Sequence, residues 1–362
     1  MNITVVRPLD LLDPEIKRWR ALQETDPLLA SPFLAPEFTQ AVGLFRDNVR
    51  VAVVTDGPDV VAFFPYERDA LGIGHPIGFG LTDVQGIVAS PDLELDAKGL
   101  LKACGLGVWD FDHLLAHQRM FAPYHAITWV EPVMDLGHGF DTYFDEARLK
   151  RVRYKERKLG RDVGDVRYVF SSDDPADLRR LMTLKSAQYN RTGRMDRFSR
   201  PWIVDLVRHF HETGFGVLSV LYAGDDVVST HFGLRNDNVM AGWFTAYDTR
   251  FAKYSPGLMG HLRLAESCPD NGITRIDMGR GGKEFKERLK SREIPIAEGR
   301  VARATVGAGL HWLRAVPLSR VRSAVLNNPR LYDRADRVLK VYARLRTGRS
   351  KPAKTRGDEA GT

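Results

Sequence analysis

The sequence predicts an α/β protein with mixed sheets, made of two related domains. Its 362 residues exceed the usual size of one domain, and 43% of them are hydrophobic, enough for two ordinary cores. Residues 51–68 and 218–235 align at a constant offset of 167 positions. A third observation is a strand–helix–strand pattern over residues 242–289. Together these favour two α/β domains over one larger unit.

The repeat describes a hairpin in each half of the chain: an apolar strand, a turn with glycine and aspartate, and a second strand. The aligned pairs are Gly57 with Gly224, Asp59 with Asp226, Val60-Val61 with Val227-Val228, and Arg68 with Arg235. Two related domains would allow one copy to keep the chemistry while the other shapes an acceptor groove. Two hairpins of common composition that align by chance are the alternative.

The aromatic and β-branched residues 243–247 predict a strand that ends at Asp248. Pro256 is suited to the first helical position, and the helix that it opens continues to Pro269. Residues 273–277 then predict a second strand. Because a helix connects the two strands, we expect them to be parallel.

The start of this helix is a candidate anion site. Gly257 allows close backbone approach, and the free N–H groups and positive dipole end of the helix would face an anion beside Ser255–Leu258. Only the second half of the chain has this turn. An ordinary helix start is the alternative interpretation.

Several motifs of this region occur in a fixed order. They are Tyr247-Asp248, the turn 254–258, Gly272, Asp277-x-Gly279-x-Gly281 and Phe285-Lys286. They resemble the carboxy-terminal half of the GNAT-like acyltransferases of the FemAB superfamily, in particular the CelD/BioF2-type acetyltransferase family linked to bacterial exopolysaccharide formation. Lys283 departs from the acidic residue that the family often has there.

Motifs in the rest of the chain extend the resemblance to roughly residues 1–300. Residues 31–38 resemble the family's Ser-Pro-Phe segment, and residues 178–193 resemble its Lys-Gln helix. Residues 82–86 resemble its Asp-aromatic-x-Gly turn, although Val84 replaces the aromatic residue. The resemblance implies tandem GNAT-like domains of the FemAB type. The implied division is an N-terminal GNAT-like domain at 1–137, a basic interdomain helix at 138–162, a C-terminal GNAT-like acyltransferase domain at 163–305, basic helices at 306–346 and a disordered tail at 347–362.

The resemblance also implies an N-acyltransferase that uses an acyl-CoA, with acetyl-CoA as the first expectation. The acceptor would be an amino group on a sugar, nucleotide sugar or exopolysaccharide precursor. One alternative is transfer from aminoacyl-tRNA, as in other branches of the superfamily. Another is a non-catalytic accessory protein of polysaccharide assembly.

Such a reaction needs a base, an oxyanion donor and an anchor for pyrophosphate. The residues expected to bind the cofactor are Tyr254, Ser255, Pro256, Gly257, Leu258, Arg280 and Lys286. The catalytic candidates are Asp248, Asp277, Tyr247 and His231. The two aspartates could act as bases at strand ends or merely cap turns, and the histidine could accept a proton or be structural. Tyr247 and Tyr254 could protonate the leaving thiolate, or simply pack.

Cys104 and Cys268 are the only cysteines. Their wide separation argues against a disulfide framework and a zinc site, so we expect no metal and two buried thiols, with a catalytic thiol as the alternative. No apolar run approaches the roughly 20 residues of a membrane span, and the amino terminus lacks a signal pattern. We therefore expect a cytoplasmic protein.

The basic residues are unevenly distributed. Residues 313–362 contain 13 Lys/Arg and 4 Asp/Glu, a net charge of +9 against +7 for the whole chain, so the basic character belongs to this tail. A basic amphipathic helix there predicts either peripheral contact with the inner membrane face or packing on the second domain. Residues 148–161 hold eight Lys/Arg. A solvated face is favoured there over contact with RNA, and contact with phosphate groups of the cofactor or of a nucleotide-sugar acceptor is the intermediate case. The partner expected for the protein is a small-molecule or saccharide acceptor rather than nucleic acid.

Overall fold

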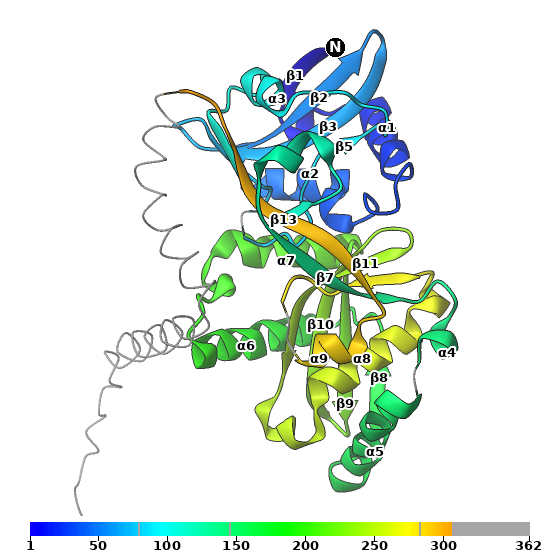
Figure 1. The fold of residues 1–362 in the computed structure, drawn as a ribbon. Helices are drawn as coiled ribbons and strands as arrows, with labels where there is room; N and C mark the ends of the chain where they lie inside the picture. The colour runs from blue at the N-terminus through cyan, green and yellow to red at the C-terminus, as the bar shows by residue number, and fades with distance from the viewer. Residues whose placement is uncertain (79, 145, 282–283, 306–362) are drawn as a thin grey trace, which may run out of the picture.

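The computed structural model of the chain describes residues 1–305 except 79, 145 and 282–283 (Figure 1). The helices expected at 306–346 and the tail expected at 347–362 lie outside the described residues. No helix of the described part is both long and apolar enough to cross a bilayer.

The first half begins with a strand and two helices and continues as a series of strands. Its elements are β1 (Asn2–Val6), α1 (Asp13–Gln23), α2 (Pro36–Phe45), β2 (Val49–Asp56), β3 (Asp59–Arg68), β4 (Ile73–His75), β5 (Val88–Ala89), α3 (Ala97–Ala103), β6 (Val108–Leu115) and β7 (His125–Asp135).

The second half repeats the strand, two-helix and hairpin order. Its elements are α4 (Phe140–Tyr143), α5 (Glu146–Asp162), β8 (Val166–Val169), α6 (Pro175–Thr192), α7 (Pro201–Thr213), β9 (Gly216–Ala223), β10 (Asp226–Arg235), β11 (Val239–Tyr247), the short 3-10 helix η5 (Thr249–Tyr254), α8 (Pro256–Ser267), β12 (Arg275–Asp277), α9 (Glu284–Leu289) and β13 (Arg292–Ala302).

The two hairpins confirm the repeat predicted from the sequence. The strands of β2–β3 and β9–β10 begin and end at positions that differ by the same 167 residues. Gly57 and Gly224 have φ of 57° and 56°, the left-handed conformation that glycine adopts without strain. Each hairpin also has a bulge at the same place, at Val61 and at Val228, where the register skips one residue.

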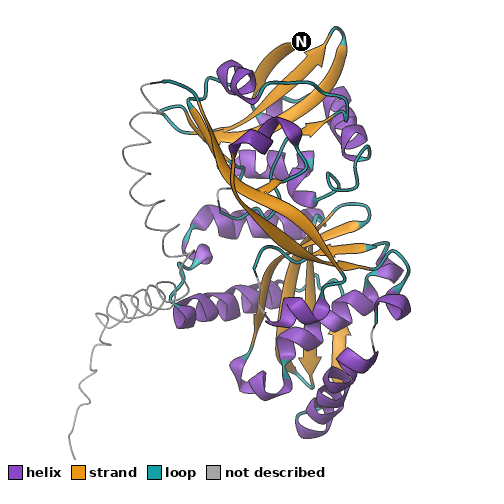
Figure 2. Ribbon diagram, in the orientation of Figure 1, coloured by secondary structure: helices purple, strands orange, loops and turns teal. Residues whose placement is uncertain are grey.

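The predicted strand–helix–strand unit is also confirmed. β11 and β12 are parallel, with α8 as the connection, and β4 and β6 form the corresponding parallel pair in the first half. Among the described strands the sheet order is β1-β2-β3-β4-β6-β13-β7-β12-β11-β10-β9-β8, with β5 beside β3. Helices flank the sheet in both halves (Figure 2).

β7 and β13 join the two halves at the centre of this sheet (Figure 1). β13 lies within the range assigned to the second domain, 163–305, yet it pairs antiparallel with β6 and β7 of the first half. β7 in turn pairs with β12. The sheet is therefore continuous across the two halves. The predicted domain boundaries follow the order of the chain, but the hydrogen bonds of β13 cross them.

One hydrophobic core also spans both halves. Phe38 of α2 stacks on Phe210 of α7 with ring centroids 5.7 Å apart, and both rings contact Trp243 of β11. The Trp243 indole N–H donates to the carbonyl of Leu81, 2.8 Å away. This packing fixes β11 against the first half, which brings residues of both halves to one cavity.

Candidate functional site

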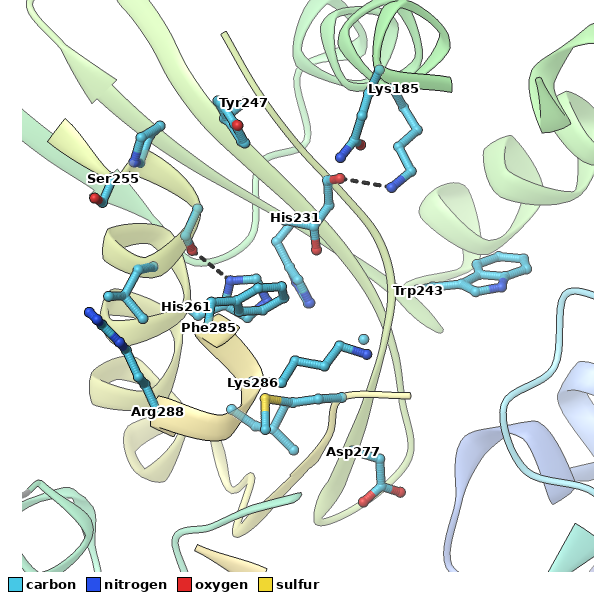
Figure 3. A pocket seen from close by; sticks show the side chains of 18 of the residues that line it. Lys185, His231, Trp243, Tyr247, Ser255, His261, Asp277, Phe285, Lys286 and Arg288 are labelled. Carbon is cyan, nitrogen blue, oxygen red and sulfur yellow. Dashed lines mark hydrogen bonds between the residues drawn. The ribbon is translucent and has the colours of Figure 1, made fainter. Parts of the chain in front are cut away.

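A cavity of about 440 Å³ opens where β11 loses its partner (Figure 3). β12 ends at Asp277, which pairs with Ala241, so no described strand pairs with residues 242–247 on that side. A bulge at Trp243 distorts the opposite edge, because Gly242 and Phe244 oppose consecutive residues of β10. Backbone N–H groups of β11 are thus available to a ligand that takes the place of a strand.

The first turn of α8 forms one wall of this cavity, with Ser255, Pro256, Gly257 and Leu258 among the lining residues. The first bond of the helical ladder runs from Met259 N–H to the Ser255 carbonyl, so the N–H groups of Gly257 and Leu258 precede the ladder. These donors and the helix dipole give this wall a positive potential.

Ser255 has φ of 60° and is the only non-glycine residue with positive φ in the described part of the chain. Such a conformation costs on the order of 1–3 kcal/mol and is common at ligand sites. Lys155 of α5 donates a hydrogen bond of 2.7 Å to the Ser255 hydroxyl. The basic helix thereby places an ammonium group at the start of α8.

The other residues expected to bind a cofactor divide into two groups. Lys286 lines the cavity and donates 2.7 Å to the Gly279 carbonyl, at the end away from Ser255 (Figure 3). Tyr254 and Arg280 do not line it. Tyr254 is buried and donates to Asp162, whereas Arg280 lies over the Trp129 ring and donates to the Asp112 carbonyl. These last two predicted roles are not favoured, because both side chains are engaged elsewhere.

Asp248 is not placed to act as a base. Its carboxylate caps η5 by accepting from the Arg250 N–H, and it forms ion pairs with Arg180 and Arg250. These hydrogen bonds and charges outweigh burial and lower its pKa, and it does not line the cavity. Asp248 therefore has the turn-capping role that was the alternative reading.

Asp277 lines the cavity but is paired with Arg275 at 2.9 Å and is 1% exposed. Burial raises its pKa. It lies level with Ala241, seven residues before Asp248, so the two carboxylates are separated by roughly 20 Å of strand. The structure therefore does not bring the two candidate bases to one cleft.

Tyr247 and His231 both line the cavity, so both remain near any reacting group. His231 is poorly suited to accept a proton at neutral pH. Its side chain is buried, and burial lowers its pKa to about 3, with the neighbouring His261 and Lys185 acting in the same direction. The neutral ring can donate or accept a hydrogen bond but gains a charge only in strong acid.

A carboxylate of the first half, Asp83, reaches the cavity as well. A Cβ added to Gly279 would collide with it, so the carboxylate lies directly against the glycine turn after β12. His113 Nε2 is 3.6 Å from Asp83, and burial raises the pKa of this carboxyl group. Residues 82–86, the turn that contains Asp83, were matched to a family motif in the sequence, but no chemical role was assigned to them.

Glu131 of β7 supports the same turn from behind. It is 0% exposed and accepts a hydrogen bond of 2.9 Å from the Gly279 N–H. Burial, together with the charges of Asp277 and Asp83, raises its pKa well above the usual range. The buried carboxyl group is thus favoured in its protonated, uncharged form.

Lys185 of α6 is another residue that sequence reasoning missed. It lines the cavity and donates 2.9 Å to the Thr245 carbonyl of β11, which holds α6 against the unpaired part of the strand. Gln188, one turn further along α6, also lines the cavity. The resemblance of residues 178–193 to a Lys-Gln helix was the signal that could have identified both.

The described residues contain no group of three His, Cys, Asp or Glu side chains that could hold a metal ion. Cys104 and Cys268 are both buried. Burial raises the pKa of each thiol to about 12, which disfavours the catalytic-thiol alternative.

Comparison with known proteins relates the chain to one domain family and to several solved structures. Residues 146–287 match the family described as acetyltransferase (GNAT) domain. No curated protein sequence matches significantly. FemX has a similar structure, with a TM-score of 0.58 and 10% identity over 86% of this chain and 99% of its own.

Two further solved structures are similar at this level. The C-terminal domain (DUF2156) of a putative lysylphosphatidylglycerol synthetase from Agrobacterium fabrum has a TM-score of 0.53 and 12% identity over 84% of this chain and 96% of its own. L-PGS from Bacillus licheniformis has a TM-score of 0.50 and 10% identity over 83% of this chain and 96% of its own. These likenesses confirm the predicted fold class: residues 146–287 match the GNAT domain family, and the chain as a whole shares the mixed α/β fold of FemX.

Proposed function

We propose that the protein is an acyl-CoA-dependent N-acyltransferase, with acetyl-CoA as the simplest donor. The observation that carries this proposal is the cavity between the unpaired edge of β11 and the first turn of α8. It combines an anion-binding helix start with a strand edge that can hydrogen-bond an extended chain. Coenzyme A has both parts, a pyrophosphate and an amide-containing arm.

The pyrophosphate would bind at the start of α8. The N–H groups of Gly257 and Leu258 precede the helical ladder, and Lys155 lies beside them through its bond to Ser255. The amide-containing arm would then follow residues 242–247, and an unpaired N–H of this strand would polarise the thioester carbonyl.

The acceptor amine would approach from the first half of the molecule, where Asp83 faces the cavity. The amine nitrogen attacks the thioester carbonyl carbon, a C–N bond forms and the C–S bond breaks. Asp83 takes the proton that the amine loses, and its raised pKa makes it a stronger base than an ordinary carboxylate. Tyr247, which also lines the cavity, is the candidate donor of a proton to the leaving thiolate.

For the acceptor we propose an amino group on a sugar, nucleotide sugar or exopolysaccharide precursor. The motif resemblance to the CelD/BioF2-type acetyltransferases supports this class. Asp83 of the first half lines the cavity together with residues of the second half, so a large acceptor could extend over the first half without displacing the donor.

Thermal-shift titration of the full chain with CoA and acetyl-CoA tests the donor site. Binding at a hundredfold excess over Kd should stabilise the fold by about 2.7 kcal/mol. Release of CoA thiol on adding amino sugars then tests transfer, with Asp83→Asn as the variant that should bind donor but not react. Absence of stabilisation by any CoA species would contradict the proposal.

The second candidate is a donor carried on tRNA, and one observation favours testing it. Arg151, Tyr154, Arg157 and Arg161 are exposed along α5, the helix whose Lys155 reaches the cavity. RNA-dependent stabilisation without any response to CoA species would support this candidate. A response to neither donor would leave the non-catalytic accessory role.

A further inference from the structure

His231 is a buried polar side chain that the proposed transfer does not use. It lies on β10, is 5% exposed and lines the cavity. Neither of its ring nitrogens has a hydrogen-bond partner among the described residues. In Figure 3 the ring lies beside that of His261.

Two glycines make room for this ring. A Cβ added to Gly242 would lie 3.3 Å from His231 Nε2, and one added to Gly233 would lie 2.9 Å from its Cε1. Nε2 therefore faces the backbone of Gly242, the first residue of β11 beyond the end of β12. This is the point where the strands part and the cavity begins.

The surroundings offer the ring little polar compensation. His261 is its nearest ring, 5.6 Å between centroids in an edge-to-face arrangement, and His261 Nδ1 is 2.7 Å from the Gly257 carbonyl. The His261 ring also contacts the Phe285 ring, with 5.2 Å between the two ring centroids. The imidazole thus faces the cavity beside one aromatic ring, and its nearest charged neighbour, Lys185, donates its hydrogen bond to the Thr245 carbonyl.

An imidazole that stays neutral has one N–H donor and one nitrogen acceptor. Leaving a buried polar group of this kind without a partner is unfavourable, because the group has lost its hydrogen bonds to water. A ligand that supplies a donor or an acceptor at this point removes that cost, whereas a ligand with only methyl or methylene groups keeps it.

The start of α8 would hold the phosphates, so the part of the donor near Gly242 is its acyl end. This step rests on the proposed function. We propose that His231 is a specificity-determining residue, and that the enzyme selects acyl groups carrying a hydroxyl or amino substituent over plain acyl chains of the same length.

The test uses two donors matched in length, butyryl-CoA and 3-hydroxybutyryl-CoA, with the full chain. Kd is measured by calorimetry and kcat/KM by thiol release with an amino-sugar acceptor. The wild-type protein should prefer the hydroxyacyl donor by about tenfold or more, the equivalent of one buried hydrogen bond. Equal or reversed preference in the wild-type protein overturns the inference.

Variants at the same position show whether the ring is responsible. His231→Leu should remove the preference, because the apolar side chain offers no partner, while His231→Gln should retain part of it. If His231→Leu keeps the full preference, a different residue or a bound water satisfies the substituent and the inference fails. If the leucine variant does not fold, the donor preference of the wild-type protein and that of the glutamine variant still test the role of His231.

Failure here is distinct from failure of the proposed function. Binding of both donors with equal affinity overturns only the role of His231. Binding of neither donor, with no stabilisation by CoA itself, overturns both.

Discussion

Gly257→Glu should leave the fold stable and strongly weaken donor binding. A Cβ at Gly257 meets only Tyr247 Cδ1, at 3.7 Å, and the residue is the second of α8. Replacing glycine within a helix gains up to roughly 1 kcal/mol, and an acidic residue in the first turn gains about 0.3–1 kcal/mol more from the dipole. The free energy of unfolding should therefore be unchanged or higher.

The same substitution should lower the affinity for the donor. Two charges about 4 Å apart interact by roughly 4 kcal/mol near a protein surface, and solvent screening reduces this. Since 1.4 kcal/mol corresponds to a factor of ten, we expect CoA affinity to fall about 10- to 1000-fold. Isothermal calorimetry with CoA and urea unfolding measure the two effects separately.

Gly257→Gln is the matched control, because it has the same shape without the charge. The glutamine variant should bind CoA more tightly than the glutamate variant, and added salt should narrow the difference. Equal affinity of the two variants would show that no phosphate lies at the start of α8, which would refute the reasoning.

Three other changes test separate parts of the site. Lys155→Met should weaken CoA binding by about tenfold, as loss of a charge-assisted contact, while Lys158→Met on the exposed face of α5 should not. Asp83→Asn should lower kcat/KM by about 10²- to 10⁴-fold and remove the rise of the wild-type rate with pH through the pKa of Asp83, which burial places above 3.8; an unchanged pH profile would exclude this base. The pKa of Glu131 in the folded protein is raised above its ordinary value of 4.5. Its contribution to the free energy of unfolding is therefore fully present below pH 4.5 and is lost as the pH rises through the folded-state pKa. Glu131→Gln should flatten the resulting fall of the urea midpoint with pH, and an unaltered fall would contradict this role of Glu131.

Local patterns predicted the hairpins and the β11–α8–β12 unit. In each hairpin a glycine with left-handed φ marks the turn, and Pro256 and Pro269 mark the two ends of α8. These signals act over a few residues, so the sequence displays them directly. The resemblance added the fold class, which the structural comparisons confirm.

The contacts that build the far end of the cavity were not predictable in this way. Asp83 lies against Gly279 although nearly two hundred residues separate them, and their contact depends on β13 returning between β6 and β7. The position of Asp248 was inferred correctly as a strand end, but its two arginine partners could not be anticipated. Charge alone did not indicate which lysine of α5 reaches Ser255.

Turn residues and periodicity act locally, so the amino-acid sequence alone predicts the repeated hairpins, the parallel strand pair and a helix start suited to an anion. Which polar groups share the cavity depends on contacts between distant parts of the chain. The tertiary structure paired Asp248 with arginines, buried His231 in a neutral state and brought Asp83 to the glycine turn. Burial and non-local pairing set these outcomes, and both depend on how a continuous sheet joins the two halves.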